Sequence, residues 1–129
     1  MQEHEIQNSI RLHISEQSLG TIFRANVGEA WTGQRVERFP DGSIRIYQPR
    51  RFTTGLPPGF SDLFGWRSQT VTAEMIGQRV AIFAGIEVKS VTGRVRPAQQ
   101  QFLNALRCAG GFSGVARSPA DAELILRGL

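Results

Sequence analysis

The sequence has 129 residues, of which 40% are hydrophobic, and a formal net charge of +4 at pH 7. We expect a single domain over residues 1–129, because this length suits one compact fold. Apolar runs too short to span a membrane and an acidic N-terminal segment exclude a membrane protein and a secretory signal, which predicts an intracellular protein. The single cysteine, Cys108, excludes an internal disulfide and lacks the neighbours of a zinc site.

The first half of the chain predicts one helix and several short strands. Isoleucines at four-residue spacing predict a helix over 3–16, and an apolar segment predicts a strand over 21–25. Residues 26–33 are expected to form a glycine-containing loop. Alternating patterns at 35–39 and 43–47, separated by Pro40-Asp41-Gly42, predict a β-hairpin. Prolines and glycines in 49–59 predict an irregular, basic loop.

The second half alternates strands with helices. A short strand is predicted at 62–66, a turn or loop at 72–77, and the strongest strand at 80–90. After a basic connector at 91–96, Pro97 opens a helix that Gly110-Gly111 ends. A strand at 112–116 and a helix begun by Ser118-Pro119 complete the chain. This order predicts an α/β fold with a mixed central sheet flanked by helices.

Two segments carry residues suited to chemistry on a phosphodiester. On the strand Ile86–Ser90, Glu87 and Lys89 share one face because side chains alternate. The same pattern also describes the charged outer face of any half-buried strand. Asp62 stands at the start of another strand, where it can equally be the cap of a turn. If the two strands are neighbours, Asp62 and Glu87 can converge on one point.

The chemistry of these groups indicates a metal-dependent hydrolase. Two carboxylates with room for water suit Mg²⁺ or Mn²⁺ rather than zinc, and Lys89 would position or polarise the attacking water. The sequence shows no Ser-His-acid or Cys-His arrangement for acyl transfer. His4 and His13, the only histidines, both fall on the first predicted helix and favour surface positions.

Several ordered motifs resemble the VRR-NUC domain of the PD-(D/E)XK nuclease superfamily. They are Glu3–Gln7, Arg24–Gly28, Gly59–Trp66, Ile86–Lys89, Gln99 and Gly114–Ser118, which together cover nearly the whole chain. The family usually has a proline before its first aspartate, where this sequence has Ser61. Proline shapes that turn and does no chemistry, so the substitution leaves the proposed metal site intact. The resemblance implies a restriction-endonuclease-like core.

The resemblance also implies the residues of the site. Asp62, Glu87 and the Val88 carbonyl would bind Mg²⁺ or Mn²⁺, with Glu3 completing the metal set and Glu5 as the alternative. Lys89 matches the catalytic lysine, and Gln99 matches a glutamine that orients groups around the metal. Phosphate contacts are expected from Arg50 and Arg51 in the basic loop and from Arg94 and Arg96 in the later connector.

Free-standing members of this family look like homodimers that cut branched DNA, including four-way (Holliday) junctions. We therefore expect a homodimeric, structure-selective endonuclease of DNA repair, in the cytoplasm of a bacterium or a phage-infected cell. The alternative is a non-catalytic DNA-binding module of the same fold, which would not need the two acids and the lysine. A purely structural interpretation makes Glu87 and Lys89 a salt-bridge pair and Asp62 a cap.

Overall fold

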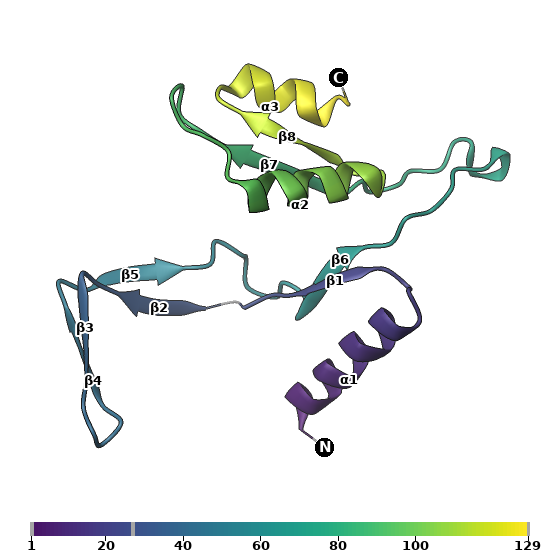
Figure 1. The fold of residues 1–129 in the computed structure, drawn as a ribbon. Coiled ribbons are helices and arrows are strands. Elements are labelled where there is room, and N and C mark those ends of the chain that lie inside the picture. The colour runs from purple at the N-terminus through teal and green to yellow at the C-terminus, as the bar shows by residue number, and fades with distance from the viewer. Residues whose placement is uncertain (1, 27, 129) are drawn as a thin grey trace. The chain divides into compact units, whose positions relative to one another are not determined.

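The computed structural model describes residues 2–26 and 28–128, which form two compact units (Figure 1). The first unit comprises Met1–Asn8 and Ile22–Phe64, and the second comprises Ser9–Thr21 and Gly65–Leu129. The single domain expected over residues 1–129 stays a prediction. Val27, within the predicted loop at 26–33, lies outside the described residues.

Helix α1 (Glu3–Glu16) agrees with the helix predicted at the start of the chain. None of its described residues is buried, and its acidic side chains Glu3 and Glu5 lie in the first turn. That position is favourable for carboxylates, because the N-terminal end of a helix carries partial positive charge. The Glu5 carboxylate also accepts a hydrogen bond of 2.9 Å from the Gln2 backbone N–H.

The first unit contains a long two-stranded arm made of two successive ladders. Strand β2 (Glu29–Thr32) pairs antiparallel with β5 (Arg50–Thr53), and β3 (Arg35–Arg38) pairs antiparallel with β4 (Ile44–Tyr47). The ladders are interrupted around Gln48, which has a positive φ of 49°, and Pro49, which has no N–H to donate. The arm is therefore one extended hairpin with an irregular joint.

The tip of this hairpin is stabilised by local hydrogen bonds. Gly42 adopts a positive φ of 87°, and the Asp41 carboxylate accepts bonds from the Ser43 hydroxyl at 2.6 Å and the Ser43 N–H at 2.9 Å. Those bonds from Ser43, the hydroxyl first, lower the pKa of Asp41 below its ordinary value. The turn predicted at residues 40–42 is confirmed.

Strand β1 (Thr21–Arg24) pairs with β6 (Leu63–Trp66), and the Ala25 N–H donates to the Asp62 carbonyl at 2.9 Å. In the first unit, the Phe64 ring contacts Phe23 and Phe60, with centroids 5.6 and 5.4 Å apart. The apolar segment before and within β6 thus belongs to a small aromatic cluster. Asp62 precedes this strand and is exposed.

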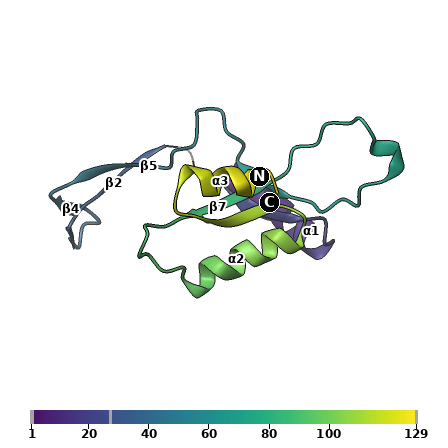
Figure 2. The same ribbon diagram turned by 90° about the horizontal axis from the view of Figure 1, so that it is seen from above.

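The second unit is built on a parallel pair of strands between two helices. Strand β7 (Ala84–Val88) pairs in parallel with β8 (Phe112–Ala116), and α2 (Pro97–Cys108) and α3 (Pro119–Leu126) lie on either side (Figures 1 and 2). A short 3₁₀ helix (Ala73–Met75) lies in the segment before β7, where a turn was predicted. Two parallel strands must be joined by a crossover connection, and α2 forms this connection between β7 and β8.

Glycines on the paired strands let each helix approach closely. A Cβ on Gly85 would lie 2.9 Å from Leu106 of α2, and one on Gly114 would lie 2.9 Å from Ile125 of α3. Because strand side chains alternate, the Gly85 contact places Glu87 on the α2 side as well. The core of this unit contains Leu103 and Leu106 on α2 and Ala116 on β8, all buried.

The expected α/β class is confirmed, with two differences in detail. Strands β2 and β5 occupy segments predicted as loops at 26–33 and 49–59, because the two segments pair with each other across the hairpin. The strand predicted at 80–90 is limited to Ala84–Val88, since its partner β8 also has five residues. In the described part of the chain the strands pair two by two, so the sheets are small.

No helix among the described residues combines the length and the apolar character needed to cross a lipid bilayer.

Candidate active site

Glu87 and Lys89 lie on one face of the β7 segment and contact each other, as the alternation of strand side chains predicts. The Lys89 Nζ atom is 3.1 Å from the Glu87 Oε1 atom. The side chains are 17% and 27% exposed for Lys89 and Glu87 respectively, so both groups are partly shielded yet open to a ligand. The contact is also the salt-bridge pair that the purely structural interpretation predicts, so the other partners of Glu87 are needed to tell the two interpretations apart.

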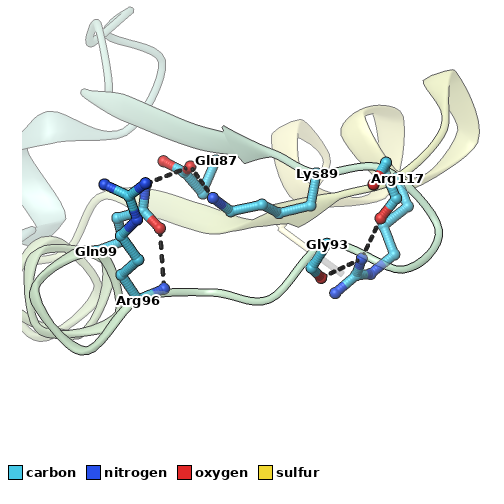
Figure 3. Close-up of polar contacts among 7 residues, drawn as sticks. Glu87, Lys89, Gly93, Arg96, Gln99 and Arg117 are labelled. Carbon is cyan, nitrogen blue, oxygen red and sulfur yellow. Dashed lines mark hydrogen bonds and ion pairs between the residues drawn. The ribbon is translucent and has the colours of Figure 1, made fainter.

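Gln99 joins the same carboxylate from the first turn of α2. Its Nε2 donates to Glu87 Oε1 at 2.7 Å, while its Oε1 accepts from the Arg96 backbone N–H at 2.9 Å (Figure 3). The second bond satisfies a free donor at the helix N-terminus, which also orients the amide. This position distinguishes Gln99 from Gln100, which instead bonds Asn104 on the outside of the helix. The three residues form what we call the Glu87–Lys89–Gln99 cluster.

The two contacts to Glu87 leave one side of its carboxylate open. Both Lys89 and Gln99 meet Oε1, and within residues 2–26 and 28–128 no hydrogen bond or ion pair reaches Oε2. An open hollow of about 390 Å³ adjoins the Glu87–Gln99 contact. Its lining is mostly apolar and includes Gly85, Ile86, Phe102 and Leu103. Glu87 and Gln99 themselves also line this hollow.

The connector from β7 to α2 is held by Arg117, which follows β8 directly. Its guanidinium Nη1 donates to the backbone carbonyls of Ser90, of Gly93 at 2.8 Å and, more weakly, of Val91 at 3.4 Å (Figure 3). The Lys89 N–H donates to the Ala116 carbonyl at 3.1 Å and extends the strand pairing by one bond. The first half of the connector, next to β7, is therefore tied to the β8 end of the unit.

The remaining predicted acids belong to the first unit. Asp62 precedes β6 and is exposed, and Glu3 and Glu5 are exposed in the first turn of α1. Val88, whose carbonyl is the other predicted ligand, is the last residue of β7. The structure thus brings together Glu87, Lys89 and Gln99 within the second unit. That Asp62 and Glu3 join them around one ion stays a prediction.

In the described residues, no group of three or more His, Cys, Asp or Glu side chains gathers closely enough to hold a metal ion. The donors that the second unit offers are the Glu87 carboxylate and backbone carbonyls, which are oxygens. Oxygen donors suit Mg²⁺ and Mn²⁺ and are poor ligands for softer metals. The chemistry of this part of the predicted set therefore fits the expected ion.

The predicted phosphate-binding arginines fall in two places. Arg50 and Arg51 are exposed on β5. The Arg51 Nε atom lies 3.4 Å from the Glu29 Oε2 atom, and the Arg51 Cζ atom lies 5.7 Å from the centre of the Trp31 ring. Arg94 and Arg96 are exposed in the connector beside the Glu87–Lys89–Gln99 cluster. The second pair belongs to the same unit as the candidate catalytic groups.

Arg117 is the residue of this region to which sequence reasoning gave no role. It was noted only as part of the motif Gly114–Ser118. The available signal in the sequence was a basic residue directly after the predicted strand at 112–116. This signal could be interpreted only once the parallel pairing of β7 with β8 was known.

Comparison with known proteins supports the family resemblance. The family model for the VRR-NUC domain matches residues 1–120 of the 129-residue chain. Searches of curated proteins and of solved structures found no significant match. The matched region contains β7, α2 and β8, and hence the Glu87–Lys89–Gln99 cluster and Arg117. The chain belongs to the VRR-NUC domain family, whose members are nuclease-type domains that act on DNA.

Proposed function

We propose that this protein is a divalent-metal-dependent endonuclease that cleaves phosphodiester bonds in branched DNA. The observation that carries the proposal is the Glu87–Lys89–Gln99 cluster. In this cluster one oxygen of the Glu87 carboxylate pairs with the Lys89 ammonium and accepts a hydrogen bond from the Gln99 amide. The scissile phosphate is anionic and repels a nucleophile, and the lysine together with a cation held by the carboxylate would offset that charge.

Glu87 and Asp62 would hold Mg²⁺ or Mn²⁺ together with the Val88 carbonyl, and Glu3, or alternatively Glu5, would complete the set. The free Oε2 of Glu87 supports this assignment, since a ligand oxygen must keep lone pairs available. When bound, the ion would lower the pKa of a water molecule and offset charge that develops on the phosphate.

Lys89 has a separate role in this proposal. Its ammonium lies beside the carboxylate and can donate hydrogen bonds to a water or a phosphate oxygen. Gln99 acts through Glu87, because its amide keeps the carboxylate turned so that Oε1 meets both donors. Arg94 and Arg96, exposed in the adjoining connector, supply positive charge for the DNA backbone.

The family resemblance supports branched DNA, such as a four-way junction, as the substrate and a homodimer as the active form. A two-fold symmetric dimer would place two active sites to match a symmetric junction and to make paired nicks. The exposed arginines Arg50 and Arg51 on β5 would add further phosphate contacts.

The direct test is cleavage of an end-labelled four-way junction, a flap, a nicked duplex and a linear duplex, with Mg²⁺ or Mn²⁺ and with EDTA. We expect metal-dependent cleavage, fastest on the branched substrates, by a protein with a dimeric mass in light scattering. Lys89→Ala and Glu87→Gln should each lower the rate by roughly 10²-fold or more, since each removes a group that acts on the reacting atoms.

The matched controls are Arg127→Ala and Glu123→Gln, which break an exposed ion pair of 2.8 Å on and just after α3. Both controls should cleave like the wild type. Equal cleavage by wild type, Lys89→Ala and Glu87→Gln would contradict catalysis at this site. Metal-independent binding of junctions without any cleavage would instead support the non-catalytic DNA-binding module.

A further inference from the structure

We propose that Arg117 is a positioning residue for the Glu87–Lys89–Gln99 cluster. It fixes the connector between β7 and α2, so that Lys89 at one end and Gln99 beyond the other both reach Glu87. The catalytic part of this inference rests on the function proposed above, whereas its conformational part can be tested without any cleavage.

The first observation is the convergence of backbone carbonyls on one guanidinium. Arg117 Nη1 donates to Ser90 and Gly93, with Val91 at the edge of bonding distance. Carbonyls brought together in this way repel one another unless a donor lies between them. A charged donor forms stronger hydrogen bonds than a neutral one. Arg117 therefore stabilises this conformation of the connector against others that the same sequence could adopt.

The second observation is what the connector joins. Ser90 follows Lys89 directly, and Arg96 donates its backbone N–H to Gln99, whose amide in turn bonds Glu87. A shift of the connector therefore moves the ammonium and the amide that meet Glu87 Oε1. Figure 3 shows Arg117 beside Gly93 at the right of the view, away from the Glu87 carboxylate.

The third observation is that Arg117 is itself firmly placed. Its backbone N–H donates to the Asp121 carboxylate at 2.9 Å, and the Asp121 N–H donates to the Ser118 hydroxyl at 3.1 Å. These bonds fix the start of α3, where Ser118 is the N-cap. The guanidinium thus extends from a rigid strand-to-helix turn, which is what holding a connector requires.

The competing role for an exposed arginine in a DNA-acting protein is a phosphate contact. The two roles predict different kinetics. Loss of a phosphate contact weakens DNA binding and flattens its salt dependence. Loss of a positioning contact lowers kcat while KM stays nearly constant, because the substrate still binds but meets a misplaced lysine.

The experiment compares Arg117→Ala and Arg117→Lys with the control Arg127→Ala on α3. Lys89 is the only lysine in the sequence, so selective ¹⁵N,¹³C-lysine labelling gives NMR signals from Lys89 alone. In metal-free protein, we expect Arg117→Ala to shift and broaden the Lys89 signals and to speed amide exchange at Gly93. Arg127→Ala should leave both unchanged.

With a four-way junction as the probe, Arg117→Ala should lower kcat by roughly ten- to a hundredfold with little change in KM. Arg117→Lys should restore part of the rate, because an ammonium can still donate to the carbonyls. Added guanidinium ion should partly rescue Arg117→Ala. An unchanged Lys89 signal and an unchanged kcat, or a raised KM with a flatter salt dependence, would overturn the proposal.

A second variant keeps the test informative if Arg117→Ala folds poorly. A Cβ at Gly93 would lie 3.1 Å from Ser90 Oγ and 3.4 Å from Lys89 Cβ, so Gly93→Ala presses on the same connector while Arg117 remains. The Lys89 signals should shift here too, and unchanged signals would count against the proposal. Absence of cleavage by the wild-type protein would refute the proposed function alone, since the Lys89 signals report positioning independently.

Discussion

At the scale of single residues, the two oxygens of the Glu87 carboxylate have different surroundings. Oε1 accepts from Gln99 and pairs with Lys89, and Oε2 faces no protein donor in the described part of the chain. Because the Glu87 side chain is 27% exposed, Oε2 can accept from water or bind a cation, as a metal ligand requires.

Gln99 should matter more for the reaction than its neighbours on α2. We expect Gln99→Ala to lower the cleavage rate by roughly 10- to 100-fold, the usual cost of losing a residue that orients a metal ligand. It should also destabilise the protein by about 1 kcal/mol, because the Arg96 N–H loses its acceptor. Gln101→Ala, at an exposed position on the same helix, is the control for both measurements. Equal rates for the two variants would exclude an orienting role.

The sequence was sufficient for part of the site at this scale. Alternation along a strand is a local property, so the shared face of Glu87 and Lys89 could be predicted from five consecutive residues. Gln99 required the family resemblance, because a glutamine followed by two more gives no local signal. Arg117 could not be assigned, since its partners are backbone carbonyls 24 to 27 residues earlier, and backbone groups carry no sequence identity.

At the scale of elements, α2 links the stability of the second unit to its candidate site. One face of this helix buries Leu103 and Leu106 against the strands, while its first turn presents Gln99 to Glu87. Leu106 is 0% exposed, and a Cβ added at Gly85 or at Gly111 would lie 2.9 or 2.3 Å from its side chain. Loosening its packing would therefore also move the amide that bonds Glu87.

Leu106→Ala should be among the most destabilising single substitutions in the second unit. Removing a fully buried leucine costs about 2–5 kcal/mol, since contacts are lost and a cavity remains. Leu124→Ala on α3, where the side chain is 50% exposed, should cost less than about 1 kcal/mol. Urea unfolding followed by circular dichroism measures both free energies. Similar midpoints for the two variants would mean that the Leu106 site is not the core described here.

The elements that the sequence predicted well are those with strong local patterns. The helices α1, α2 and α3, the β3–β4 hairpin and β8 agree with the predicted ranges to within a residue or so. Strands β2 and β5 were missed because each gains its hydrogen bonds from the other, across a hairpin that the intervening prolines and glycines obscured. The apolar residues 80–83 were overassigned to a strand, although pairing with β8 begins only at Ala84.

At the scale of the whole molecule, the proposed metal site requires carboxylates from segments far apart in the sequence. Glu87 belongs to the second unit, with Lys89 and Gln99 already in place around it. Asp62 and Glu3 belong to the first unit. Their proposed convergence on one ion with Glu87 is a long-range property, which sequence spacing alone does not determine.

Binding of Mn²⁺ to the protein, measured by isothermal titration calorimetry, tests this claim most directly. The account predicts that Asp62→Asn and Glu87→Gln each weaken Mn²⁺ binding by roughly tenfold or more and abolish junction cleavage. Glu123→Gln, which alters an exposed carboxylate on α3, should leave the affinity unchanged. Wild-type Mn²⁺ affinity in either Asp62→Asn or Glu87→Gln would contradict the account.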